Sequence, residues 1–366
     1  MRAPTGSSQA PPAASASLAD VLRIQRDACL EVGSALYVRL IDRCLGRIDR
    51  SGPIRDLLAP HAADPFGSAL ALRFLGAVHR LVLEGAAPDL AREYPSVGGT
   101  PGPDLEDVFE ATVEAHLDRL SVHIGRGVQT NEVGRAVALA GALLGLAELG
   151  LPLRVFEVGA SAGLNLRWDH FRYEAGSDAF GEPSSPVRFI EPWVDRRPRL
   201  DVEIEVVERL GCDLAPIDAT TDGGRLTLRA FVWPDLVARF QRLDAAIEVA
   251  RRVPAPVHST EASRWVAERL AEPMAGTVTA VMHSVVLQYL PTAERRMLLA
   301  RIADAGARAT RRAPLAWIRM EPGRQGCETR CTLWPGGRER LLSVSSYHGP
   351  PVRWLEREHV QGRANR

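Results

Sequence analysis

One short segment, residues 153–166, most constrains the fold of this 366-residue chain. An apolar run ends in Glu157 and Val158, and small residues from Gly159 to Gly163 follow it. This order predicts a strand, a tight turn and the start of a helix, because glycine allows positive φ and a close approach of the backbone to a ligand. Free N–H groups at a helix start favour a bound carboxylate or phosphate, and an acid at the strand end suits an ammonium or hydroxyl group.

The segment resembles motif I of the class I S-adenosylmethionine (SAM)-dependent methyltransferases, in which an acidic strand end precedes a glycine turn. It departs from that motif at Ser161, where glycine is usual. A dinucleotide-binding turn would place its third glycine at the position of Leu164. A tight turn in any other doubly wound sheet is the alternative explanation. The resemblance implies SAM as the cofactor, bound in this segment by Glu157, Gly159, Ala160, Ser161, Gly163 and Asn165.

The string from Glu157 to Leu166, together with residues 128–135 upstream, is more specific. Both are similar to an uncharacterised bacterial family, domain-of-unknown-function family 2332, over roughly residues 18 to 355. The resemblance implies a methyltransferase-like fold and brings no established substrate. Because the upstream string is shared, we expect Asn131, Glu132 and Arg135, with Gln129, to join the cofactor site. The alternative is the solvated first turn of a helix.

The chain reads as a tail, a helical part and an α/β part. Residues 1–17, rich in Ala, Pro and Ser, predict a disordered tail. Apolar residues at helical spacing predict a helical N-terminal subdomain over residues 18–125. The α/β domain is expected over residues 126–366, with a Pro-, Gly- and Arg-rich insertion near 172–200. A long helix, capped by Thr130 and stopped by Gly150, should lead into its first strand.

Further strands are expected at residues 202–206, 256–258, 277–290 and 315–320, and a β-hairpin at 329–345. Strands that alternate with helical segments predict a parallel sheet. The predicted fold is therefore α/β, a Rossmann-like class I methyltransferase sheet with a terminal β-hairpin, preceded by the helical subdomain.

Other polar residues fall where parallel strands end, and ligands of open α/β sheets bind at that edge. The methyltransferase resemblance implies that Asp213 binds the ribose hydroxyls and Glu261 the adenine amino group. A surface turn for Asp213, and a first-turn acid that stabilises a helix dipole for Glu261, are the alternatives. Trp233 and Asp235 are weaker pocket candidates, since a lone tryptophan is usually core and an acid after Pro234 suits a helix start.

His283 is the catalytic candidate. It falls at the end of the clearest buried strand, and its ordinary pKa suits removal of a proton from a hydroxyl or amine near neutrality. A hydrogen-bonded structural histidine is the alternative. We expect no metal site, because the cysteines lack zinc spacing.

Two other functions compete with the methyltransferase. Gly159 to Gly163 also matches Gly-x-Ser-x-Gly, the turn that carries the nucleophile of many hydrolases, so Ser161 could be a catalytic serine. A methyltransferase-like protein that binds a ligand without catalysis is the third hypothesis.

Composition limits the partners. With 45 basic and 45 acidic residues the net charge is zero, so neither general nucleic-acid binding nor binding to an acidic membrane is expected. Five cysteines, an odd number, argue against a disulfide framework and predict a reduced, cytoplasmic protein. The N-terminus lacks the apolar core of a signal peptide, and no apolar run approaches the roughly 20 residues of a membrane span. A small-molecule ligand is the expected partner, and the oligomeric state is left open.

Overall fold

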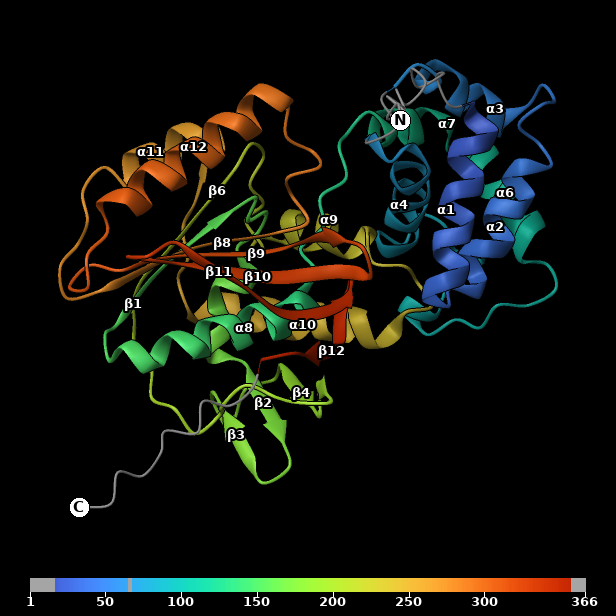
Figure 1. Ribbon diagram of the computed structural model, residues 1–366. Coiled ribbons are helices and arrows are strands. Elements are labelled where there is room, and N and C mark those ends of the chain that lie inside the picture. Colours follow the sequence, from blue (N-terminus) through green and yellow to red (C-terminus); the bar gives the residue numbers. More distant parts are fainter. Residues whose placement is uncertain (1–16, 65–67, 357–366) are drawn as a thin grey trace, which may run out of the picture. The chain divides into compact units, whose positions relative to one another are not determined.

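The computed structural model describes residues 17–64 and 68–356 (Figure 1). The chain divides into two compact units. The helical unit comprises the described residues up to Val128 together with Ala230–Val237, and the sheet unit comprises Gln129–Arg229 and the chain from Ala238 onward. The helical unit thus includes residues 230–237, which the sequence assigned to the α/β domain. Of the predicted tail, residues 1–16 lie outside the described residues.

The helical unit is built from amphipathic helices around one apolar core. Ser17, expected in the tail, instead forms a capping box with Asp20 at the start of the first helix. Gly33 ends that helix in the left-handed conformation. The helices are α1 (Leu18–Val32), α2 (Ala35–Leu45), α3 (Pro53–Leu58), α4 (Leu70–Leu83), α5 (Pro88–Ala91), α6 (Leu105–Ala115) and α7 (Leu117–Ile124), with short 3₁₀ turns η1 (Ala59–His61) and η3 (Pro95–Val97).

The sheet unit contains a nine-stranded mixed sheet in the order β5-β12-β11-β10-β9-β8-β1-β6-β7. Strands β7, β6, β1, β8 and β9 are parallel, which confirms an α/β protein. The strands are β1 (Leu153–Val158), β5 (Trp193–Val194), β6 (Val206–Asp213), β7 (Val257–Ser259), β8 (Val278–Ser284), β9 (Leu315–Gly323), β10 (Gly326–Trp334), β11 (Arg338–Ser346) and β12 (Gly349–Trp354).

The C-terminal part of the sheet is larger than the predicted hairpin. Strands β9 to β12 form an antiparallel meander, so the expected pair β10 and β11 is flanked by a partner on each side. The expected strand at 202–206 is displaced: β6 begins at Val206 because its partner β1 begins at Leu153, and the two residues are in register. The insertion forms a separate small sheet of β2 (Arg172–Ala175), β3 (Asp178–Phe180) and β4 (Arg188–Ile190).

Helices cover both faces of the large sheet (Figure 1). α11 (Ala262–Arg269) and α12 (Thr292–Arg308) pack on one face, where Phe156, Val158 and Val281 are buried against them. α8 (Ala136–Leu144) and α10 (Val237–Arg252) lie on the other face. The remaining segments are α9 (Asp222–Ala230), η4 (Val133–Arg135), η5 (Gly145–Leu149) and η6 (Leu164–His170).

The predicted long helix begins later than expected. Thr130 is not its cap: a 3₁₀ turn, η4, starts at Val133, and the α-helix starts at Ala136. The cap of η4 is Glu132, in extended conformation, whose side chain accepts the N–H of Gly134. Within the described residues, no helix is both long and apolar enough to span a membrane.

Candidate functional site

The carboxyl ends of the parallel strands meet at one edge of the sheet, which we call the rim. Val158 at the end of β1 is in register with Cys212 of β6 and His283 of β8. The glycine turn, residues 159–163, follows β1 directly, and Gly159 and Gly163 both have positive φ, at 68° and 65°. The rim therefore holds the predicted cofactor segment and the predicted catalytic histidine within three adjacent strands.

The glycine turn leaves little room for side chains. A Cβ on Gly159 would lie 2.4 Å from Val286 Cγ2, and one on Gly163 would lie 2.9 Å from Val257 Cγ2. Ser161 adopts φ of 52°, a conformation that costs a residue with a side chain and that glycine adopts freely. The position where a glycine was expected thus has the backbone of a glycine.

Most N–H groups of the turn are bonded inside the protein, which corrects the expectation of a free anion site. Gly159 and Ala160 both donate to the carbonyl of Cys212, at 2.9 and 3.0 Å. Ser161 donates to Asp213 and Leu164 to Asn131. The segment that follows is a 3₁₀ helix of seven residues, η6, rather than the start of an α-helix.

Glu157 is the most unusual group of the rim. It is 2 % exposed, and its Oε2 atom has no hydrogen-bond partner among the described residues. Burial raises its pKa to about 8, and Asp213 adds to the rise, although Arg135 and Arg167 oppose it. At neutral pH the carboxyl group is therefore mostly protonated in the absence of a ligand.

Two more buried oxygens of the rim have no hydrogen-bond partner in the part of the chain that the structure describes. They are Oδ1 of Asn165, which is 1 % exposed, and Oε2 of Glu321. Asn165 uses its amide N–H₂ to donate to the carbonyl of Glu132 at 3.3 Å. All three atoms are oxygens that can accept hydrogen bonds, Glu157 once its carboxyl group is ionised, so this edge is suited to a ligand that presents N–H or O–H groups rather than phosphate.

Asp213 lies at the end of β6, as expected, and supports the glycine turn. Its two oxygens accept the N–H groups of Ser161, at 2.9 Å, and of Ala215, at 3.0 Å. The carboxylate keeps further lone pairs and is only partly buried. Its geometry fits both a structural role and contact with ligand hydroxyl groups.

The upstream string, residues 129–135, lies beside the glycine turn, which confirms the predicted proximity. Ser161 Oγ donates to Gln129 Oε1 at 3.1 Å, and Asn131 Oδ1 accepts the N–H of Leu164 at 2.8 Å. Gln129 and Asn131, on either side of Thr130, are thus bonded to the glycine turn, and residues 127–132 form no helix.

Glu132 and Arg135 are both bonded within the protein. Glu132 pairs with Arg239, and despite its burial Arg239 and His348 hold its pKa well below the usual range. Arg135 donates to the carbonyl oxygens of Tyr347, at 2.9 Å, and Ser284, at 3.1 Å. Burial lowers the pKa of its guanidinium. Arg135 therefore connects η4 to β8 and to the turn between β11 and β12.

His283 is completely buried and both ring nitrogens are engaged, which fits the structural alternative. The indole N–H of Trp317 donates to Nε2 at 3.0 Å, and Nδ1 lies 2.6 Å from Glu321 Oε1. Because an indole only donates, Nε2 must accept, so the proton is on Nδ1 and is donated to Glu321. As placed, His283 orients Glu321 and has no nitrogen free to take a proton from a substrate.

Glu321 itself was missed by the sequence reasoning. Its Oε1 also accepts the N–H groups of Val286, at 3.1 Å, and Leu287, at 3.4 Å. Val285, a β-branched residue with φ of 54°, begins this turn. The available signal was an acid directly after the strand 315–320, the same signal that identified Glu157.

Arg167 was missed as well. It is 5 % exposed and donates to the carbonyls of Val253 and Gly163, both at 2.7 Å. Burial lowers its pKa to about 10, with Arg209 adding to the effect. Its position in a short polar segment gave no sign of burial.

The remaining candidates lie elsewhere. Glu261 is the exposed residue before α11, and among the described residues its side chain forms no hydrogen bond or ion pair. Trp233 and Asp235 belong to the helical unit, where Trp233 packs at 6.0 Å from the Tyr37 ring and Asp235 accepts Ser34 Oγ–H and Leu36 N–H at the start of α2. This geometry supports the core alternative for Trp233. Asp235 does not lie in the first turn of the helix after Pro234, as its alternative expected, because α10 begins at Val237 and Asp235 bonds to the start of α2 instead.

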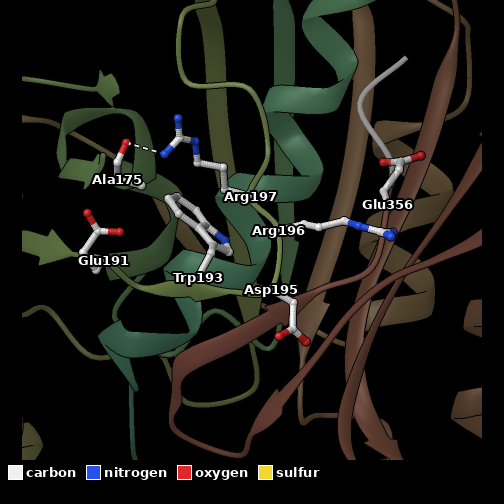
Figure 2. A pocket seen from close by; sticks show the side chains of 7 residues that line it. All are labelled: Ala175, Glu191, Trp193, Asp195, Arg196, Arg197 and Glu356. Atoms are coloured by element: carbon white, nitrogen blue, oxygen red, sulfur yellow. Dashed lines mark hydrogen bonds between the residues drawn. The ribbon is translucent and has the colours of Figure 1, made fainter. Parts of the chain in front are cut away.

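A hollow of about 620 Å³ lies beside β5 (Figure 2) and contains none of the predicted residues. Arg197 donates to the carbonyl of Ala175 at 2.8 Å, and Arg196 to that of Leu355 at 2.9 Å. The hollow is also lined by carboxylates, Glu191, Asp195 and Glu356, so its charge is mixed. Its composition does not point to one class of ligand.

Comparison with known proteins adds a family. Residues 19–354 match a family described as an uncharacterized protein conserved in bacteria (DUF2332), and the chain belongs to this family. The predicted family resemblance is confirmed over nearly the predicted range. The match brings no activity, and no curated protein matches the chain.

Proposed function

We propose that this member of the DUF2332 family binds SAM at the rim and is a methyltransferase. The observation that carries the proposal is the set of buried oxygen acceptors, led by Glu157, beside a glycine turn at the end of β1. The parallel strands run outward from β1 in both directions, in the order β7-β6-β1-β8-β9, and ligands of open α/β sheets bind at the carboxyl ends of such strands.

The residues present fit the ammonium group of SAM. Glu157 Oε2 and Asn165 Oδ1 are acceptors that an ammonium group could satisfy. Asp213, with lone pairs left over, is the candidate for the ribose hydroxyls, and Glu261 remains the candidate for the adenine amino group. The cofactor would supply an electrophilic methyl group.

The rim differs in one chemical respect from the cofactor site that the methyltransferase resemblance implies. Its N–H groups are mostly bonded internally, so recognition depends on acceptors, and a phosphate-bearing dinucleotide is disfavoured. Since His283 donates to Glu321 and accepts from Trp317, we do not assign it as a base. The protein's contribution would be positioning of the methyl acceptor, which can account for much of the rate of such a reaction.

Calorimetric titration with SAM and S-adenosylhomocysteine tests the proposal. Binding of both, weakened at least tenfold in Glu157→Ala, is the expected result, because a hydrogen bond to a charged group contributes about 1.5–3 kcal/mol. Folded protein that binds neither would refute it. Transfer of labelled methyl groups to any cell extract separates an enzyme from the non-catalytic ligand-binding alternative.

The serine hydrolase is less well supported. Positive φ at Ser161 is compatible with a nucleophile turn, but the hydroxyl donates to the amide oxygen of Gln129 at 3.1 Å, where a base would be required. We expect a fluorophosphonate probe to leave Ser161 unlabelled. Labelling that disappears in Ser161→Ala would reverse this ranking.

A further inference from the structure

The rim contains two buried carboxyl groups in opposite environments. Glu321 is surrounded by donors, because its Oε1 accepts Nδ1–H of His283 and two backbone N–H groups. Glu157 is 2 % exposed and has no such set of donors. A buried carboxylate without donors is strongly disfavoured, so a group like Glu157 takes up a proton instead.

The charged and titratable groups around Glu157 are not arranged to ionise it. Arg135 on η4 donates to the carbonyls of Tyr347 and Ser284, and Arg167 on η6 to those of Val253 and Gly163. Asp213 on β6 repels a second negative charge, and the neighbouring Cys212 is a neutral buried thiol, whose pKa burial raises to about 12. Both arginines favour ionisation of Glu157, but among the residues that the structure describes neither forms an ion pair with it.

We propose that Glu157 is a proton-linked binding residue: it holds a proton in the free protein and releases it when the ammonium group of a ligand binds. The carboxyl O–H bond breaks, its proton goes to the solvent, and the carboxylate accepts N–H donors from the ligand. The role of SAM in this inference rests on the proposed function, whereas the protonated state of Glu157 does not.

The release of the proton makes ligand affinity depend on pH. Below the pKa of Glu157, one proton must leave for each ammonium group bound, so affinity should rise about tenfold for each pH unit. Above that pKa the rise should stop. The pH range in which this rise can be measured ends near pH 8, because an ordinary α-amino group of the ligand also begins to lose its charge there.

Calorimetry in buffers of different ionisation enthalpy counts the released protons. At about pH 6.5 to 7, below the pKa of Glu157, binding of S-adenosylhomocysteine, which carries the amino-acid group, should release close to one proton. Binding of 5′-methylthioadenosine, which lacks that group, should release none. Glu157→Gln should abolish the release. Glu208→Gln is the matched control, because Glu208 lies on β6 in an ion pair with Arg154 and should leave the count unchanged. Binding of S-adenosylhomocysteine with no proton release, or equal release in Glu157→Gln, would overturn this inference without refuting the proposed function.

The protein without ligand provides an independent test. The pKa of Glu157 is higher in the folded protein than the ordinary value of an unfolded chain. The resulting contribution to stability is fully present at a pH below the ordinary pKa, and it is lost as the pH rises toward the pKa of the folded state. Glu157→Gln should therefore raise the melting temperature relative to the wild type by an amount that grows from about pH 5 to about pH 8. If neither nucleoside binds in the calorimetric experiment, the proposed function fails. In the melting experiment, a difference between Glu157→Gln and the wild type that does not change with pH would show that Glu157 is not protonated and would overturn the inference.

Discussion

At the scale of single residues, neighbouring carboxyl groups acquire different chemistry from their hydrogen bonds. Glu157 and Glu321 each follow a buried run that forms a parallel strand. Glu321 accepts three N–H groups and is fixed, whereas Glu157 is left with an unpartnered oxygen. Sequence position alone predicted that an acid at a strand end faces the rim, and the surrounding donors decide which acid is available to a ligand.

Replacing Glu321 should destabilise the sheet unit. In Glu321→Ala the Nδ1–H of His283 and the N–H groups of Val286 and Leu287 lose their acceptor, and we expect a loss of about 3 kcal/mol in the free energy of unfolding. Glu321→Gln retains one acceptor oxygen and should lose only about 1 kcal/mol. Urea unfolding followed by fluorescence measures both; equal stability of the Ala variant and the wild type would show that the turn does not depend on Glu321.

The sequence could identify Glu157, Asp213 and the upstream string as neighbours, because strand ends and shared strings carry that information. It could not assign His283, since the choice between a free and a bonded histidine depends on Trp317, a residue of the adjacent strand. The same limit applies to Arg167, whose partners are carbonyl groups without a sequence signal.

At the scale of elements, residues 129–135 act as a clamp between the glycine turn and the turn that joins β11 to β12. Gln129 and Asn131 bond to the first, and Arg135 to the second. From the sequence alone, removal of Asn131 or Arg135 was expected to weaken ligand binding and leave the melting temperature nearly unchanged. These bonds revise the second half of that expectation.

We now expect Asn131→Ala and Arg135→Ala to affect both properties. Asn131→Ala leaves the N–H of the buried Leu164 without its acceptor, and Arg135→Ala removes the donor to the carbonyl groups of Tyr347 and Ser284. The free energy of unfolding should therefore fall by about 1 kcal/mol for Asn131→Ala and about 2 kcal/mol for Arg135→Ala. Affinity for S-adenosylhomocysteine should fall as well. Normal affinity combined with the loss of stability would show that the clamp is only structural.

Gly134 is the tightest point of the clamp. A Cβ there would lie 2.2 Å from the carbonyl oxygen of His348, a backbone atom that cannot easily move. We expect Gly134→Ala to lose about 1–3 kcal/mol in thermal or chemical unfolding. Gly145→Ala, at the end of α8, has open space around its Cβ and ordinary helical φ of −61°, and should be neutral or slightly stabilising. Similar effects of the two substitutions would contradict the close backbone contact.

Asp235 gives a test within the helical unit. Its oxygens accept Ser34 Oγ–H at 2.6 Å and Leu36 N–H at 2.9 Å at the start of α2. Asp235→Ala should lower the stability of this unit by about 1–2 kcal/mol, as loss of a helix cap does, and leave ligand affinity within twofold of the wild type. A larger fall in affinity would return Asp235 to the list of pocket residues.

At the scale of the whole molecule, hydrophobic patterns predicted the α/β class and the alternating strands and helices, because these patterns are local. They did not predict the meander from β9 to β12, since the partner of each strand depends on the other strands of the sheet. They also could not show that residues 230–237 leave the α/β part and complete the core of the helical unit, where Trp233 is buried.

We propose that the rim binds SAM through the acceptors beside the glycine turn. This binding can be measured by titrating wild-type protein, Glu157→Ala and Asp235→Ala with S-adenosylhomocysteine in one calorimetric series. We predict saturable binding to the wild type, at least tenfold weaker binding to Glu157→Ala, and unchanged binding to Asp235→Ala. Absence of binding to folded wild-type protein, or equal affinity of the wild type and Glu157→Ala, would contradict the account.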